Sequence, residues 1–556
     1  MPPSGPVFKL GALSYGIPAN GSGPNGAGRP SSRLARTGVG NDPDAFSAFR
    51  RRRTYALTPK SGRVLPQWLG AQPGQTNRWH GDLRNCMSSK VLLISANRCT
   101  MPDPVFPLGL AFLNASLRQA GHRTAWLDSL TDSECLEQVL AAFRPDFVGI
   151  SLRNIDDVLI RKQKTFFGDL ISLSVRIRKQ TLSPIILGGS GFSIFPQPLL
   201  ELTGADFGIC GAGELGFVSL ITALENRANF HAIPGLVFRQ NGKITANSPS
   251  SNVLDQGLTG ADWPVPTISH YLRSSGMLNL QTQRGCGFRC CYCTYPLIEG
   301  TLHHSRPPKM VAAEFQELQQ RGARHVFITD SIFNSSPRHI REVCEAILQL
   351  NIKMSWSCFL RPQGLTPELM KLMARAGLAH IEFGSDSLCD EVLSVYHKDF
   401  TFEDVLYSSE LARQEKVDCC HFLIVGGPGE SRATLEKGFA NSQRLRGAVI
   451  IAVVGMRIYP GTPLFERAVA EGCIQRNTDL LTPAYYLAPG LDSETIVAQL
   501  QQFARRSSSW IVGDPDPAYS GLVERLRQRG VVGPLWSYFA AIQRLWPKGV
   551  TGGPAQ

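Results

Sequence analysis

The feature that most constrains this chain of 556 residues is a run of closely spaced cysteines near its middle. Cys286, Cys290 and Cys293 follow the spacing CxxxCxxC in the segment RGCGFRCCYCTYP, residues 284–296. Three thiolates can bind three irons of a four-iron cluster and leave the fourth iron without a protein ligand. An iron with an open coordination position can bind and reduce a small molecule, so this loop is predicted to be a reaction centre.

A structural zinc site is the alternative explanation for clustered cysteines. Zinc in such sites takes four protein ligands, usually completed by a second CxxC pair or by two histidines. The other cysteines of the chain are scattered and form no second CxxC pair, so the cluster is favoured. Cys291 also lies inside the motif, but using it in place of Cys290 would change the spacing, and we treat it as a non-ligand.

The cysteine motif and its setting resemble the radical S-adenosylmethionine (SAM) superfamily. The resemblance implies a [4Fe-4S] cluster whose open iron is chelated by the amino and carboxylate groups of SAM. It also implies that an electron from the cluster cleaves SAM to a 5′-deoxyadenosyl radical. An electron donor such as flavodoxin or ferredoxin is then expected as a partner.

The segment around and after the cysteines, residues 276–490, predicts a partial (β/α)6 barrel. Short apolar runs alternate there with helix-length segments, and two of these segments, 310–322 and 367–377, end at glycine. In barrels of parallel strands the chemistry gathers at the carboxyl ends of the strands. The predicted strands are residues 278–283, 325–329, 354–359, 380–384, 419–425 and 450–457.

The resemblance places SAM against the ends of these strands. Tyr292 matches an aromatic position near the adenine, and Glu382 and Ser385 match a segment that meets the ribose. Asp330 is expected either to accept a hydrogen bond from the ammonium group of SAM or from substrate, or to cap the next helix. Arg457 is expected either to bind the carboxylate of SAM or to lie at the surface. The expected SAM contacts are Tyr292, Asp330, Glu382, Ser385, Gly426 and Gly427.

Residues 88–230 predict a doubly wound, Rossmann-like α/β domain. Predicted strands at 91–95, 124–128, 147–151, 185–189 and 207–210 alternate with helix-length segments, which indicates a parallel sheet. Ligands bind such sheets outside the carboxyl ends of the strands, and glycines there let backbone amides approach a bulky polar ligand. The connector 231–275 is predicted to contain a small hairpin near 235–244.

The segments of this domain together resemble the cobalamin-binding domain that precedes the barrel in many radical SAM enzymes. They are a Pro-x-Gly-Leu helix start, Arg-Pro-Asp-x-Val-Gly-Ile-Ser, a Gly-Gly strand end and a Gly-x-Gly-Glu turn. The resemblance implies cobalamin contacts at Pro107, Leu108, Ser151, Leu152, Gly188, Gly189, Ser190, Gly211 and Glu214.

One departure concerns the lower face of cobalt. Other cobalamin proteins supply a histidine from Asp-x-His-x-x-Gly, and none of the eleven histidines here has that setting. The lower axial position would therefore hold water, another side chain or nothing.

The net charge of +12 does not indicate a nucleic-acid partner, because residues 1–87 alone carry +9 of it. These residues are rich in Gly, Pro, Ser and Arg and read as a disordered basic leader. A misplaced translation start before Met87 is the favoured explanation, ahead of a flexible tail or a targeting peptide. No apolar run is long enough to span a bilayer, and a cytoplasmic location is expected.

Taken together, these patterns predict a cobalamin-dependent radical SAM enzyme that methylates an unactivated carbon of a small or amphipathic, lipid-like substrate. A radical SAM cyclase or rearrangement enzyme without methyl transfer is the first alternative. A non-catalytic iron–sulfur protein that senses redox state is an alternative from another class. Residues 491–556 are predicted to form a helical C-terminal region and tail.

Overall fold

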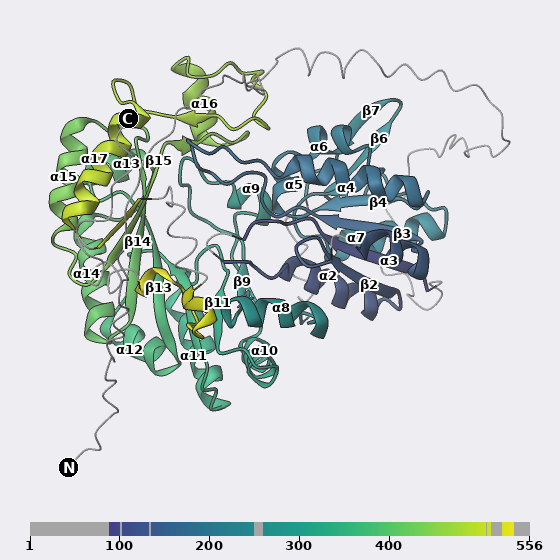
Figure 1. The fold of residues 1–556 in the computed structure, drawn as a ribbon, viewed down its shortest axis with the longest axis horizontal. Helices are drawn as coiled ribbons and strands as arrows, with labels where there is room; N and C mark the ends of the chain where they lie inside the picture. Colours follow the sequence, from purple (N-terminus) through teal and green to yellow (C-terminus); the bar gives the residue numbers. More distant parts are fainter. Residues whose placement is uncertain are drawn as a thin grey trace, which may run out of the picture. The chain divides into compact units, whose positions relative to one another are not determined.

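The computed structural model describes residues 88–100, 103–132, 135–249, 260–507, 509–512 and 525–538. All of them lie in one compact unit of the chain, residues 80–556. The described part contains two seven-stranded sheets, one from each predicted α/β domain (Figure 1). The predicted leader, residues 1–87, lies outside the described residues.

The first sheet has the strand order β2-β1-β3-β4-β5-β6-β7. Strands β1 to β5 are parallel, as predicted, and follow the 2-1-3-4-5 order of flavodoxin-like folds. The predicted hairpin is present as β6 and β7, and it pairs antiparallel with β5, so this sheet continues beyond residue 230. The strands are β1 (Lys90–Ser95), β2 (Arg123–Asp128), β3 (Phe147–Ser151), β4 (Ile185–Gly188), β5 (Phe207–Ile209), β6 (Leu236–Gln240) and β7 (Lys243–Ala246).

Helices cover both faces of this sheet because its strands are apolar on both sides. Val91 and Leu93 pack with α2 (Leu108–Gln119) and α7 (Glu214–Glu225). Leu92 and Ile94, whose side chains alternate with those two along the strand, pack on the other face. That second face carries α3 (Leu136–Phe143), α4 (Phe167–Gln180) and α6 (Pro196–Thr203).

The second sheet is a partial barrel of parallel strands in the order β18-β15-β14-β13-β12-β11-β8. Six of its strands are those expected from the sequence. The short strand β18 was not predicted: it comes from the C-terminal region expected to be helical and pairs with β15. The strands are β8 (Met277–Leu280), β11 (His325–Ile328), β12 (Ser355–Leu360), β13 (Leu378–Asp386), β14 (Asp418–Val425), β15 (Val449–Val454) and β18 (Trp510–Val512).

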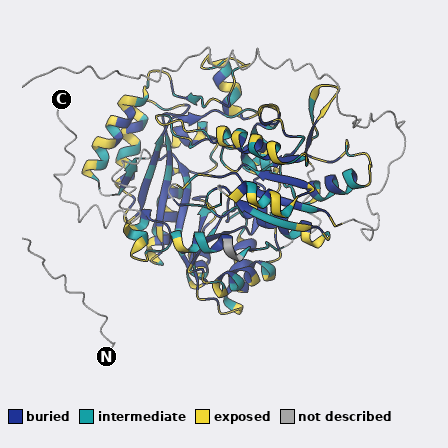
Figure 2. Cartoon of the chain, turned by 45° about the vertical axis from the view of Figure 1, so that its right-hand side comes forward, coloured by how far each residue is buried: buried dark blue, intermediate teal, exposed yellow. Residues whose placement is uncertain are grey.

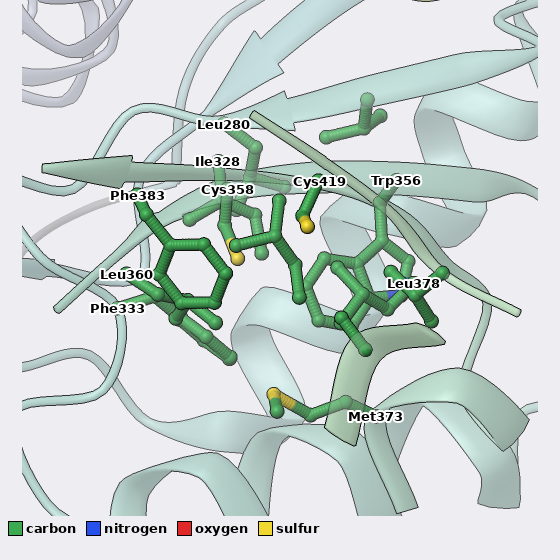
Figure 3. Close-up of a cluster of buried hydrophobic side chains, with 14 of the residues drawn as sticks. Leu280, Ile328, Phe333, Trp356, Cys358, Leu360, Met373, Leu378, Phe383 and Cys419 are labelled. Carbon is green, nitrogen blue, oxygen red and sulfur yellow. The ribbon is translucent and has the colours of Figure 1, made fainter. Parts of the chain in front are cut away.

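The barrel strands bury one set of side chains under the outer helices and turn the other set inward. Val326 and Ile328 are fully buried in the main hydrophobic core, and Trp356 of β12 donates a hydrogen bond from Nε1 to the Ala376 carbonyl at 2.9 Å (Figure 3). The sheets are buried and the helices expose their outer faces (Figure 2). The covering helices are α10 (Pro308–Gln320), α11 (Pro337–Gln349), α12 (Pro367–Arg375), α14 (Phe402–Gln414), α15 (Arg432–Ser442) and α17 (Ser493–Arg506).

Among the described residues, three buried ion pairs join the domains of the two sheets. Arg457, at the end of the short strand β16 (Met456–Arg457), contacts Asp156 of the first domain at 2.9 Å, and both side chains are almost completely buried. Arg457 was expected at the SAM carboxylate or at the surface, and its burial rules out the surface position. The other two pairs are Arg284–Glu214 and Arg527–Asp103, each at 2.7 Å.

Loss of the Arg457–Asp156 pair is expected to destabilise the protein strongly. Arg457→Leu leaves the Asp156 carboxylate buried without its cation, which costs about 3 kcal/mol or more. Arg413→Leu, which breaks an exposed pair with Glu410 on α14, is the control and should cost below about 1 kcal/mol. Urea unfolding followed by circular dichroism measures both, and equal losses would contradict the role given to the buried pair.

Candidate functional site

The cysteine motif lies in the loop that follows β8 and the short strand β9 (Gln283–Arg284) and precedes α9 (Tyr295–Glu299). Its backbone is closed by hydrogen bonds. The Cys286 N–H donates to the Gly300 carbonyl at 3.0 Å, and the Cys293 N–H donates to the Cys290 carbonyl at 3.1 Å. The loop thus stands at the carboxyl end of the first barrel strand, where chemistry was expected.

The three thiols of the motif lie near enough to influence one another's charge. Burial raises the pKa of Cys286 and raises that of Cys293 to about 12, and negative charge on Cys290 adds to both shifts. The backbone N–H groups of Phe288 and Tyr295 act in the opposite direction, lowering the pKa of Cys286 and of Cys293 respectively. Within the described residues, no three His, Cys, Asp or Glu side chains are close enough to share one metal ion. A four-iron cluster does not need that proximity, because each thiolate binds a different iron.

Cys291 belongs to the hydrophobic core. Its side chain is 5% exposed and packs in the cluster that contains Tyr396 and Met456. Its backbone N–H donates to the Tyr396 carbonyl at 3.1 Å, and its carbonyl accepts from the Leu464 N–H at 2.8 Å. These contacts support a structural role for Cys291 and fix the loop against the rest of the barrel.

A buried group of polar residues lies beside the loop. The Tyr292 hydroxyl donates a hydrogen bond to Asp386, and Asp386 forms an ion pair with Lys398. The side chains of Asp386 and Lys398 are 6% and 5% exposed. Lys398 also lies 5.6 Å from the centre of the Tyr292 ring. Burial, Asp386 and the charge on nearby cysteines raise the pKa of Tyr292, so its hydroxyl stays protonated. Sequence reasoning missed Lys398, since nothing in its local sequence connects it with the cysteines.

Asp330 holds the chain just ahead of the cysteines. Its carboxylate accepts from the Thr282 N–H at 2.6 Å, from the Gln283 N–H at 3.2 Å and from the Thr282 hydroxyl. Burial raises its pKa to about 7, although these donors oppose the shift. Asp330 therefore fixes the β8–β9 turn, and the next long helix is capped by Ser336 instead. A contact with SAM or substrate stays a prediction, and Asp330 is not among the residues that line the large cavity described below.

Ser385 and Gly427 also face protein groups. Ser385 is fully buried and its hydroxyl lies 2.8 Å from Nδ1 of His421. A Cβ atom at Gly427 would lie 2.1 Å from the Tyr396 hydroxyl oxygen, so this glycine makes room for that ring. Gly426 has a φ of +91° and its N–H donates to Glu430. None of these three residues lines the large cavity.

That cavity, with a volume of about 1920 Å³, lies between the strand ends of the first sheet and the interior of the barrel. Of the nine expected cobalamin contacts, eight line it and Leu152 does not, because the Leu152 side chain is buried in the core. Gly189 has a φ of +94°, and a Cβ there would lie 2.5 Å from the Leu152 carbonyl oxygen, so it is needed for the turn itself. The cavity-lining members are Pro107, Leu108, Ser151, Gly188, Gly189, Ser190, Gly211 and Glu214.

Glu214 connects the two halves of the site. Its carboxylate accepts from Nη2 of Arg284 at 2.7 Å, and Nε of Arg284 donates to Oε1 of Gln281 at 2.7 Å. Glu299 continues the network, since it accepts from Gln281 at 3.3 Å and from the Gly285 N–H at 3.1 Å. The first-domain turn is thus joined by hydrogen bonds to the residue that precedes Cys286.

The barrel side of the cavity is apolar. Half-buried side chains of the inward-facing positions line it, with Phe327 and Phe359 in edge contact at 5.0 Å. The buried carboxylate of Glu382 also lines it and accepts from Nε1 of Trp536 at 3.0 Å. Burial raises the pKa of Glu382 to about 7. The inward-facing apolar residues are Phe327, Phe359, Phe422, Ile451 and Val453.

Comparison with known families matches two separate parts of the chain. Residues 280–438 match the radical SAM superfamily, and residues 95–221 match the B12 binding domain. The chain is therefore a radical SAM protein that carries a B12-binding domain ahead of its partial barrel. Proteins of this class use a [4Fe-4S] cluster, SAM and cobalamin as cofactors.

Particular relatives narrow the comparison. The chain is 26% identical over 455 residues to tryptophan 2-C-methyltransferase of Streptomyces laurentii, a match that covers 69% of this chain and 75% of the relative. It is 24% identical over 350 residues to the anaerobic magnesium-protoporphyrin IX monomethyl ester cyclase of Cereibacter sphaeroides. That match covers 60% of this chain and 55% of the relative. Among solved structures, the radical SAM methyltransferase TsrM from Kitasatospora setae, with cobalamin and a [4Fe-4S] cluster bound, shares the fold with a TM-score of 0.75. That match is 24% identical and covers 83% of this chain and 98% of TsrM.

The residues present fit these cofactors. Three thiols in one loop, with backbone N–H groups that favour the charged form of two of them, are suited to a cluster. Pockets for one drug-sized ligand usually measure about 300–1,000 Å³, and this cavity is about 1920 Å³, which leaves room for more than one large ligand. Arg153, at the end of β3, also lines the cavity, and its Nε donates to the Asn154 side chain at 2.8 Å.

Substitution at Gly427 tests whether this glycine serves packing. Gly427→Ala places a methyl group against the Tyr396 hydroxyl and should destabilise the protein by about 1–3 kcal/mol. Gly438→Ala, in α15 with nothing within 4 Å of the new Cβ, is the control and should stabilise by about 0.5–1 kcal/mol. Thermal unfolding measures both. A neutral Gly427→Ala variant would leave close approach to a ligand as the better explanation.

The raised pKa of Glu382 predicts a pH-dependent stability difference. The folded state holds the proton of Glu382 up to about pH 7, whereas the unfolded chain releases it near its ordinary pKa of 4.5. The wild type should therefore lose up to roughly 3 kcal/mol relative to Glu382→Gln as the pH rises from 5 to 8. Urea unfolding across this range measures the difference, with Glu436→Gln on the exposed face of α15 as the control. A pH-independent difference would contradict the burial of an ionisable Glu382.

Proposed function

We propose that this protein is a cobalamin-dependent radical SAM methyltransferase that acts on an unactivated carbon of a small or amphipathic substrate. The observation that carries the proposal is the single cavity shared by the B12-binding domain and the radical SAM barrel. When bound, the cluster and SAM supply a carbon radical that removes hydrogen from the substrate, and cobalamin supplies the methyl group. The methyltransferase relatives support this choice.

The chain's own residues would bind and orient these groups. Cys286, Cys290 and Cys293 hold the cluster, and the glycine-bordered strand ends of the first domain receive cobalamin. The Glu214–Arg284 bond keeps these two positions in a fixed relation. Fixed proximity of reacting groups is what makes a bimolecular transfer fast and selective.

The barrel interior favours an apolar substrate or an apolar part of one. In closed barrels of this kind the interior is filled by layers of side chains, whereas Phe327, Phe422 and Ile451 border open space here. Water forms few hydrogen bonds with such apolar walls, so the hydrophobic effect favours an apolar ligand there. Glu382 is a polar group on these walls that could accept a hydrogen bond from substrate or from the SAM ribose.

A radical SAM cyclase is the second candidate, because one relative is such an enzyme. Product analysis separates the two activities: methyl transfer adds the labelled methyl group of SAM to the product, and cyclisation does not. A non-catalytic iron–sulfur protein would produce neither product and would not cleave SAM.

An electron donor such as flavodoxin or ferredoxin and a cytoplasmic location stay predictions. Within the described residues, no helix combines the length and apolar character needed to cross a membrane.

The experiment uses full-length protein produced with added cobalamin and reconstituted with iron and sulfide under anaerobic conditions. We expect the absorption of bound cobalamin, about four irons per chain, and 5′-deoxyadenosine after addition of SAM and a strong reductant. Absence of 5′-deoxyadenosine would refute radical chemistry. Absence of bound cobalamin would refute the methyltransferase proposal in particular.

Cysteine variants test the ligand assignment. Cys286→Ala, Cys290→Ala and Cys293→Ala should each lose most of the bound iron, because the cluster needs all three thiolates. Cys291→Ala is the matched control in the same loop and should keep its iron, since Cys291 packs in the core. Iron analysis and electron paramagnetic resonance (EPR) spectroscopy measure the result. Loss of iron from Cys291→Ala with retention in Cys290→Ala would reverse the assignment.

A further inference from the structure

Arg361 is a buried cation, and two of its donor nitrogens, Nε and Nη2, lack hydrogen-bond acceptors in the described part of the chain. It follows β12 at the carboxyl end of the barrel, and its side chain is 7% exposed. Asn334 fixes its backbone, accepting from the Arg361 N–H at 2.9 Å and donating to its carbonyl at 3.0 Å. Within the part of the chain that the structure describes, Nε and Nη2 of Arg361 are buried and have no hydrogen-bond partner.

Such an arrangement is costly unless something is bound there. A buried donor without an acceptor costs about 1–3 kcal/mol, and more when it is charged. The Asp399 carboxylate lies 3.7 Å from Nη2, which is too long for a hydrogen bond, and the Asp399 side chain is 70% exposed. The two free donors therefore point to a missing anionic acceptor.

The position of the guanidinium identifies where that acceptor belongs. Arg361 stacks on the Phe288 ring, with 3.7 Å between the guanidinium carbon and the ring centre. The same carbon lies 5.2 Å from the centre of the Phe400 ring. Phe288 stands between Cys286 and Cys290 in the loop. The stacking therefore fixes the charge of Arg361 against the iron–sulfur loop.

A second buried cation borders the same loop. The Lys398 side chain is 5% exposed and lies 5.6 Å from the centre of the ring of Tyr292, the residue directly before Cys293. Two cations thus border a loop that must carry three thiolates.

We propose that Arg361 is a positioning residue of the iron–sulfur loop, donating from Nε and Nη2 to sulfur of the cluster and, with Lys398, stabilising its reduced state. The proposal rests on the cluster assignment made under the proposed function. Hydrogen bonds to sulfur and nearby positive charge both raise the reduction potential of a cluster. The carboxylate of SAM is the other anion that could accept from Arg361, so the test is made without SAM first.

The variants are Arg361→Gln, which removes the charge, and Arg361→Lys, which keeps it. Arg338→Gln, at an 85% exposed side chain on α11, is the control. An EPR-monitored redox titration without SAM should give a more negative midpoint potential for Arg361→Gln, a value nearer wild type for Arg361→Lys, and no shift for the control. A potential unchanged in Arg361→Gln, together with weakened SAM binding, would assign the donors to SAM and overturn the proposal.

Iron analysis of the same samples shows whether each variant holds a cluster. An unchanged midpoint potential in Arg361→Gln that holds as much iron as Arg338→Gln overturns the proposal, whatever its affinity for SAM. Wild-type protein that binds no iron would instead refute the proposed function, so the two failures are distinguishable.

Discussion

The site depends on the way two sheets are held with their strand ends toward one cavity. Buried ion pairs do this: Arg284 with Glu214, Arg457 with Asp156, and Arg527 with Asp103. A buried charge is tolerated only when it is paired and hydrogen-bonded, so each pair fixes the position at which its two partners meet across the domains. Only Gly285 separates Arg284 from Cys286 in the chain. The contact between the domains and the position of the cysteine loop are therefore coupled.

The walls of this cavity differ in chemistry between its two sides. Phe327, Phe359 and Val453 leave the barrel interior open and apolar, while the strand ends of the first domain supply glycines and backbone groups. The polar residues next to the cysteines, Tyr292 and Asp386 among them, form a separate buried group. Reactive intermediates formed between such walls would be shielded from water.

The strands were predictable because their pattern is local. Runs such as residues 91–95 are apolar on both faces, as parallel strands covered by helices must be, and the structure confirms them as β1 to β5. The short strand β18 was not predictable, since three residues give no periodic signal and only pairing with β15 makes them a strand. The hairpin β6–β7 was predicted, but its place at the edge of the first sheet depends on pairing with β5.

The sequence by itself determined the two α/β domains, their order and the cysteine loop, because spacing and periodicity are properties of short segments. Only the tertiary structure decided which candidate side chains face the cavity. Asp330, Ser385 and Gly427 have the residue types of ligand contacts, yet Asp330 and Ser385 bond to Thr282 and His421, and Gly427 packs against Tyr396. Arg361 and Lys398 lie about 70 and 105 residues from the cysteines in the chain, and only folding brings their charges to the loop.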